Sequence, residues 1–226
     1  MIGSGLGDGS SGAGTGATGP TLRNISLSIP KGQLCAVVGP IGSCKSSLLS
    51  CLLGEMECSV GYARVAGSIS YAAQKPWIFA GSVRENILFH RPYHAERYEQ
   101  AVRACQLKPD IERLPAGDDT LIGERGVNLS GGQKARVALA RAVYSDADVY
   151  LFDDPLSAVD VVVGSKIFQH VLSNSGMLAG KTRILVTHQT QFLPQCDNVV
   201  VLSQGEVRAT GSYQQLKASG AKKFAC

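Results

Sequence analysis

The feature that most constrains the fold is a glycine-rich turn between an apolar run and an amphipathic segment. The turn reads Gly39-Pro40-Ile41-Gly42-Ser43-Cys44-Lys45-Ser46-Ser47, and it follows the apolar residues 34–38. A short buried strand that passes through such a turn into a helix directs successive backbone N–H groups toward an anion. The sequence therefore predicts a phosphate-binding loop, in which Lys45 reaches the phosphates and the Ser46 hydroxyl ligates Mg²⁺.

One position of this loop departs from the usual pattern, G-x-x-x-x-G-K-[ST]. Cys44 stands where the pattern has a glycine before the lysine. A β-carbon there is expected to strain the turn or to crowd the phosphates. Taken by itself, the loop is also compatible with an ordinary corner between a strand and a helix, so the rest of the chain must decide.

Composition limits the classes of function that need to be considered. The chain has 226 residues with 44% hydrophobic content, enough for one sizeable α/β domain or for two small lobes that share a core. No apolar run reaches the roughly 20 residues of a membrane-spanning helix, so any membrane role needs a partner. The net charge is +4, with dispersed lysines and arginines, and we expect no nucleic-acid partner.

The organisation of the chain follows from its patterning. Residues 1–20 are rich in glycine and serine and are expected to be a disordered leader. Alternation over 25–29 predicts a strand in a hairpin with 34–38, and alternation over 61–71 predicts two short antiparallel strands. Apolar spacings of three and four predict a small helical subdomain over about 82–130.

A second candidate anion site lies at the start of a later helix. Ser130, Gly131, Gly132 and Gln133 follow Leu129 and precede a segment with helical apolar spacing. A serine hydroxyl, unhindered glycine N–H groups and the positive end of a helix together favour an anion. A simple helix cap is the alternative interpretation.

Candidate metal-binding and catalytic residues follow apolar strands. The run 149–154 ends in Asp153 and Asp154. An acid at the carboxyl end of a parallel strand, beside a phosphate loop, is suited to hold Mg²⁺, which we assign to Asp153. Asp154 is then placed to orient or deprotonate a water molecule. Gln74 and His188 each follow a predicted strand, and a lone histidine at a strand end is more often structural than catalytic.

Taken together, these motifs resemble the nucleotide-binding domain of ATP-binding-cassette (ABC) proteins over about residues 21–226. In the order of that family the chain has the phosphate loop, the Q-loop glutamine Gln74, the signature 129–133, the Walker B strand 149–153, the D-loop 157–160 and the switch histidine His188. Within the family, the chain is similar to the first nucleotide-binding domain of multidrug-resistance-associated (subfamily C) exporters. That similarity rests on residues 123–134, 142–146 and 153–160.

The resemblance implies an α/β fold with a RecA-like P-loop NTPase core, an antiparallel β subdomain and a small helical subdomain. It implies ATP and Mg²⁺ as cofactors, with ATP sandwiched in a head-to-tail dimer between residues 39–47 of one domain and residues 130–133 of the other. The catalytic residues implied are Asp154, His188 and Gln74, and the metal-binding residues are Ser46, Gln74 and Asp153. The partners implied are the transmembrane domains of an exporter and a second, like or unlike, nucleotide-binding domain, at the cytoplasmic side of a membrane.

Two departures from the family pattern predict a slow ATPase. Asp154 replaces the glutamate that most members carry, and Cys44 occupies the loop; in addition, no aromatic residue precedes Tyr62 to stack on adenine. The alternatives are a non-hydrolysing ATP-binding regulatory module and an inactive truncated fragment of a transporter. A soluble ABC machine acting on nucleic acid is disfavoured, because no coiled-coil insertion separates Gln74 from the signature.

Overall fold

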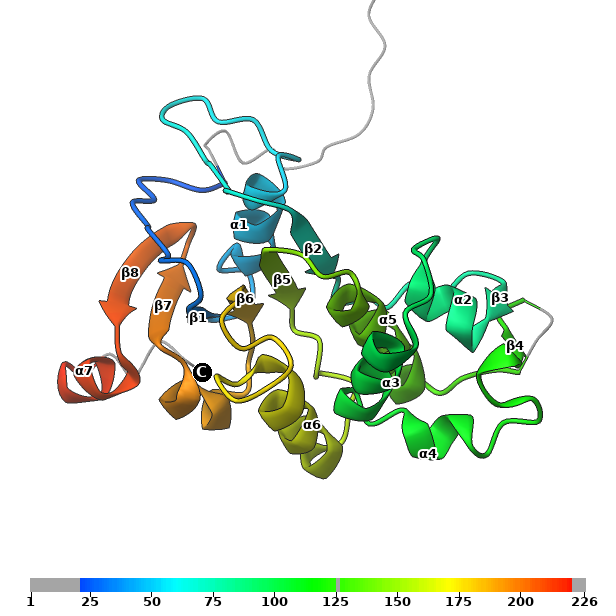
Figure 1. Ribbon diagram of the computed structural model, residues 1–226. Coiled ribbons are helices and arrows are strands. Elements are labelled where there is room, and N and C mark those ends of the chain that lie inside the picture. Colours follow the sequence, from blue (N-terminus) through cyan, green and yellow to red (C-terminus); the bar gives the residue numbers. More distant parts are fainter. Residues whose placement is uncertain (1–20, 125–126, 221–226) are drawn as a thin grey trace, which may run out of the picture.

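The computed structural model describes residues 21–124 and 127–220, and the predicted leader over 1–20 lies outside this range. The described chain is built on a six-stranded sheet in the order β2-β5-β6-β1-β7-β8 (Figure 1). Its strands are β1 (Leu34–Val38), β2 (Ile69–Ala72), β5 (Val149–Asp153), β6 (Thr182–Val186), β7 (Asn198–Ser203) and β8 (Glu206–Gly211). The pairs β2–β5, β5–β6, β6–β1 and β1–β7 are parallel, and β7–β8 is an antiparallel hairpin.

Helices cover both faces of this sheet. The α-helices are α1 (Lys45–Leu52), α2 (Val83–Leu88), α3 (Ala95–Ala104), α4 (Lys108–Ile111), α5 (Gly131–Tyr144), α6 (Val161–Ile167) and α7 (Tyr213–Ala218). The remaining elements are the 3₁₀ helices η1 (Gly117–Asp119) and η3 (Thr190–Gln195), the π-helix η2 (Phe168–Leu172) and the short strands β3 (Gly81–Ser82) and β4 (Leu121–Ile122). Together these elements give the mixed α/β architecture that the sequence predicts.

Successive residues of β1 are buried in two different apolar cores. Leu34, Ala36 and Val38 join the larger core with residues of α5 and α6, whereas Cys35 and Val37 join a smaller core with residues of α1. Every residue of β1, β5 and β6 is buried. Two-sided burial explains why β1, residues 149–152 of β5 and residues 184–186 of β6 are continuous apolar runs rather than alternating ones.

Several sequence predictions of secondary structure are confirmed. The buried strands after Gln33 and before Asp154 form as β1 and β5. Helices begin at Lys45, within the phosphate loop, and at Gly131 in the signature. The helical pattern after Ser82 forms as α2, α3 and α4, which lie with α5 at one end of the molecule (Figure 1). Its treatment as a separate subdomain over about 82–130 stays a prediction.

The predicted strand over 25–29 is wrong. No strand forms there, because both hydrogen-bonding edges of β1 are occupied, by β6 and by β7. The alternating apolar residues Ile25, Leu27 and Ile29 instead pack, partly buried, against the smaller core. The alternation of apolar and polar residues over 25–29 therefore indicates a segment with one buried face, which does not pair with a strand.

The two antiparallel strands predicted over 61–71 are also wrong. Only Ile69–Ala72 is a strand, and it pairs in parallel with β5. Consequently, neither this stretch nor 25–29 supplies the expected antiparallel β subdomain. Both stretches instead line, together with α1, an open cavity of about 1080 Å³. Over residues 21–124 and 127–220, no helix has both the length and the apolar character needed to cross a membrane.

Candidate nucleotide-binding site

The phosphate loop begins where β1 ends, and its first glycine is required by close packing. A β-carbon on Gly39 would lie 2.0 Å from the carbonyl oxygen of Leu202 in β7. Gly42 has φ of 79° but open space around it, so there the backbone conformation alone favours glycine. Close packing against β7 thus requires glycine at position 39, and the backbone conformation of the turn favours glycine at position 42.

The side chain of Lys45 lies inside the phosphate loop and is hydrogen-bonded to it. Its Nζ donates hydrogen bonds to the carbonyl oxygens of Gly39 and Pro40, each at 2.9 Å, and to Ser43 Oγ at 3.3 Å. The residue is only 7% exposed, and burial lowers its pKa while the charges of Asp154 and Asp153 act in the opposite direction. An ammonium group with only neutral acceptors is well suited to an anionic ligand, because hydrogen bonds between charged groups are the stronger ones.

Cys44 carries the strain expected at this position. Its backbone has φ of 71° and ψ of 30°, in the left-handed region that glycine adopts freely. A residue with a β-carbon loses about 1–2 kcal/mol in this conformation. The half-buried thiol makes a 3.7 Å hydrogen bond to the carbonyl oxygen of Gly42, so the side chain turns back onto the loop.

We expect Cys44→Gly to raise the melting temperature of the chain by about 2–4 °C, since relief of roughly 1 kcal/mol shifts a domain of this size by that amount. It is also expected to tighten Mg-ATP binding, because the loop no longer carries a β-carbon facing the phosphates. Thermal melts and titration calorimetry measure the two effects. Gly42→Ala is the matched control, since it adds a β-carbon at a similar φ in open space and should lower the melting temperature. Unchanged melting of both variants would contradict this account of the loop.

Paired carboxylates stand at the end of β5, two strands from the loop. Asp153 and Asp154 are each 5% exposed. The backbone N–H of Asp154 donates to the carbonyl oxygen of Val186 at 2.9 Å, and its φ of 47° lies in the left-handed region that aspartate tolerates better than most residues. This hydrogen bond to the end of β6 fixes the position of the Asp154 backbone, from which its side chain projects.

The Asp154 carboxylate is incompletely satisfied. Its Oδ1 is buried without a hydrogen-bond partner among the residues that the structure describes. Burial raises the pKa of this carboxyl group, while the nearby His188 opposes the shift. An unpartnered buried acceptor calls for an explanation, and a bound water or ligand is one that also fits the position beside the loop.

The remaining predicted catalytic residues lie at the same edge of the sheet. Gln74 follows β2 and His188 follows β6, and both are exposed. Because β1, β2, β5 and β6 are parallel, their carboxyl ends share one edge, which is where ligands bind in open α/β sheets. Ser46 and Ser47 begin α1 at this edge, and the Ser46 residue is exposed. The fold therefore places these residues along the same sheet edge as the phosphate loop, with β2 three strands from β1.

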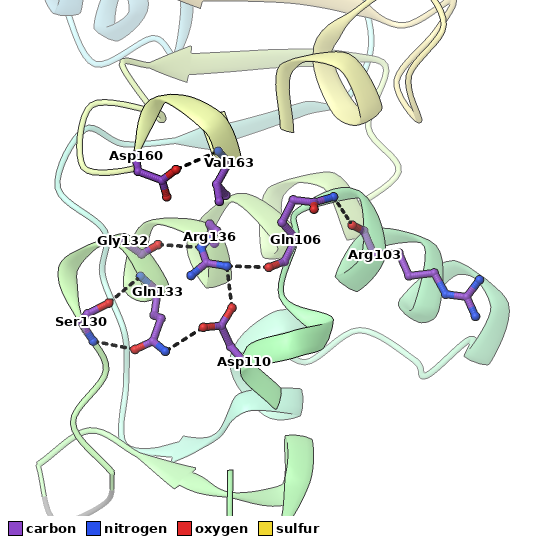
Figure 2. A network of polar contacts seen from close by, with 9 residues as sticks. All are labelled: Arg103, Gln106, Asp110, Ser130, Gly132, Gln133, Arg136, Asp160 and Val163. Carbon is purple, nitrogen blue, oxygen red and sulfur yellow. Dashed lines mark hydrogen bonds and ion pairs between the residues drawn. The ribbon is translucent and has the colours of Figure 1, made fainter. Parts of the chain in front are cut away.

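The signature turn forms a complete capping box at the start of α5. Ser130 Oγ accepts from the backbone N–H of Gln133 at 3.2 Å, and Gln133 Oε1 accepts from the backbone N–H of Ser130 at 2.9 Å (Figure 2). The backbone N–H groups of Gly131 and Gly132 make no hydrogen bond to any residue that the structure describes. A β-carbon on Gly132 would lie 3.0 Å from the carbonyl oxygen of Ala158, so the D-loop packs closely against this glycine.

The signature turn is not joined to the phosphate loop of the same chain. Among the described residues, no hydrogen bond links 130–133 to 39–47. The turn is instead bound to α4 through Asp110 (Figure 2). Sequence reasoning missed Asp110 and its second partner Arg136, and the spacing of Gln133 and Arg136 on one face of α5 was the only signal available.

Together, the strand, the glycine loop, the buried lysine and the acidic tip of β5 define a nucleotide-binding site of the P-loop class. The family model described as "ABC transporter" matches residues 22–157. The chain therefore belongs to the ABC transporter family, and the similarity to subfamily C is confirmed by its relatives.

The chain is 54% identical over 197 residues to ATP-binding cassette sub-family C member 3 of Homo sapiens, a match that covers 87% of this chain and 13% of that protein. It is 54% identical over 196 residues to ATP-binding cassette sub-family C member 2 of Mus musculus, with the same coverage of 87% and 13%. The chain thus spans a small part of the length of these relatives.

Proposed function

We propose that the chain binds Mg-ATP and hydrolyses it in a head-to-tail dimer with a second nucleotide-binding domain. The dimer would be coupled to separate membrane domains, with the chain peripheral at the cytoplasmic side of a membrane. The observation that carries this proposal is the buried Lys45 ammonium inside the glycine loop, at the same sheet edge as Asp153 and Asp154. The names of the relatives support ATP as the nucleotide.

The proposal assigns binding to two surfaces. Residues 39–47 hold the phosphates of one ATP, with Lys45 exchanging neutral carbonyl acceptors for charged phosphate oxygens. The N–H groups of Gly131 and Gly132 face the phosphates of the ATP held by the partner domain, with Ser130 and Gln133 shaping the turn. Because no hydrogen bond joins these two surfaces among the described residues, we assign the completion of each site to a second domain.

The metal and the reacting water are assigned to the acidic edge. Ser46, Asp153 and Gln74 supply the oxygen donors that Mg²⁺ prefers, and the ion would neutralise charge on the phosphates. Asp154 takes the proton of the attacking water, whose oxygen bonds to the γ-phosphorus while the bond to the β-phosphate oxygen breaks and ADP leaves. His188 beside Asp154 orients the same water.

A non-hydrolysing ATP-binding module is the second candidate, and the backbone of Asp154 favours it. Aspartate is one methylene shorter than the glutamate that most members of the family carry here, and the backbone of Asp154 has φ of 47°. Small misplacements of a base cost about 10²-fold in rate. This candidate predicts binding of Mg-ATP without release of phosphate.

Titration calorimetry of the full chain with Mg-ATP tests the proposal. We expect a saturable heat and a rise in melting temperature, since a ligand at 100 times its Kd adds about 2.7 kcal/mol to stability. Phosphate release measured with a partner domain then separates the two candidates. Absence of both the heat and the melting shift would overturn nucleotide binding itself.

A further inference from the structure

We infer that Asp110 in α4 is a positioning residue that holds the signature turn in the shape that presents its glycine N–H groups. The inference rests on the proposed function of that turn. Asp110 Oδ1 accepts from Gln133 Nε2 at 2.9 Å, and Asp110 Oδ2 accepts from Arg136 Nη1 at 2.6 Å (Figure 2). One carboxylate of α4 thereby binds two side chains of the first turns of α5.

The bond to Asp110 decides which way the Gln133 amide faces. An ionised carboxylate can only accept hydrogen bonds, so it must face the NH₂ group of the amide. The amide oxygen is then directed to the backbone N–H of Ser130, which it accepts at 2.9 Å. Reversal of the amide would lose both bonds, so Asp110 fixes the capping box from outside the helix.

Arg136 holds Asp110 in place and links the junction of α3 and α4 to α5. Besides Asp110, its guanidinium donates to the carbonyl oxygen of Gln106 at 2.5 Å and to that of Gly132 at 3.3 Å (Figure 2). The Arg136 and Asp110 side chains are only 13% and 19% exposed. An ion pair shielded from water keeps its geometry, and removal of one partner leaves the other charge uncompensated.

The hydrogen bonds around Gln133 leave the backbone N–H groups of Gly131 and Gly132 as the available donors of the signature turn. The amide oxygen of Gln133 accepts from the backbone N–H of Ser130, and its amide nitrogen donates to Asp110. The backbone N–H of Gln133 donates to Ser130 Oγ. Gly131 and Gly132 therefore supply the N–H groups that can face a phosphate. Gln133, which the sequence assigns to nucleotide binding, is on this account a residue that shapes the turn.

The test compares the full chain carrying Asp110→Ala with the matched control Asp118→Ala. Asp118 forms a similar pair with Arg84, at 2.9 and 3.0 Å, its side chain is likewise 19% exposed, and it does not contact the signature. The readout is amide hydrogen exchange over residues 128–137, which needs no nucleotide.

We expect Asp110→Ala to speed exchange in this segment at least about fivefold, because local opening follows the loss of tethering contacts, and Asp118→Ala to leave it unchanged. Titration with Mg-ATP should give a Kd within about twofold of wild type, since the phosphate loop is untouched, whereas ATP-dependent self-association should weaken about tenfold. Equal exchange in the two variants would overturn the inference.

A reversed hydrogen bond provides a rescue that excludes a general loss of folding. Gln133→Glu alone places two carboxylates face to face and should speed exchange over 128–137. Adding Asp110→Asn returns an amide donor opposite the new carboxylate, and exchange should slow again toward wild type. A double variant that exchanges no more slowly than Gln133→Glu would contradict the inference. If wild type shows no heat with Mg-ATP, the proposed function fails, and the exchange comparison still decides the role of Asp110.

Discussion

Lys45→Ala is expected to weaken Mg-ATP binding at least about 100-fold, equivalent to about 2.7 kcal/mol. The Lys45 ammonium lies inside the loop with only neutral oxygen acceptors, and a hydrogen bond between charged groups contributes about 1.5–3 kcal/mol. Titration calorimetry with Mg-ATP on the full chain measures the loss.

The control for this prediction is Lys31→Ala, which removes an exposed lysine just before β1, at the opposite end of that strand. It should bind Mg-ATP like wild type. Because Lys45 also bonds the loop carbonyls, the melting temperature of each variant without nucleotide shows whether the fold is retained. A folded Lys45→Ala chain that binds Mg-ATP with wild-type affinity would contradict the assignment of the phosphate loop to the nucleotide-binding site.

Asp154→Asn is expected to lower the rate of phosphate release by about 10²–10⁴-fold, the usual contribution of a general base. Asparagine keeps the shape of the side chain and tolerates the φ of 47°, so the loss should come from chemistry rather than folding. Mg-ATP affinity should change little. Phosphate release is measured with a partner domain present, beside calorimetric binding by each variant.

The same variant should gain stability at neutral pH. Burial raises the pKa of Asp154 above its unfolded value, so the native chain binds the proton more tightly. Stability from this group is therefore present below the unfolded pKa and declines as the pH rises through the folded pKa. Asp154→Asn lacks this decline, and its melting temperature should exceed that of wild type increasingly from acidic to neutral pH. An advantage that shrank with rising pH would contradict the assignment.

Asp154→Glu provides the opposite comparison. The longer carboxylate extends the reach of the base by one methylene, and turnover should rise by up to about tenfold. Glutamate tolerates the left-handed backbone less well than aspartate, so a lower melting temperature should accompany the gain. A turnover unchanged by this substitution would place the rate limit in another step.

Local sequence was sufficient for the elements that carry the phosphate loop and the acids. The run Leu34–Val38 and residues 149–152 are apolar because both faces of those strands are buried, and a glycine turn follows the first of them. The capping box of Ser130 and Gln133 is also local, since it spans four residues. Such features depend on neighbouring residues in the chain and can be predicted from it.

Pairing between distant segments could not be predicted in the same way. The alternation over 25–29 is real, but β6 and β7 already occupy both edges of β1, and β6 comes from about 150 residues further along the chain. Likewise, β2 pairs with β5 rather than with its own neighbours. Alternation shows that a segment has one buried face, and only the competition between strands decides whether it pairs.

The sequence by itself determined the class of the protein, because a phosphate loop, a signature turn and an acidic strand end are short-range patterns with a direct chemical meaning. Only the tertiary structure decided how these parts are held. It buried Asp154 with one oxygen unpartnered, left Cys44 in a left-handed turn, and brought Asp110 to Gln133 and Arg136. Burial and long-range hydrogen bonds depend on how distant segments pack, and no local pattern encodes them.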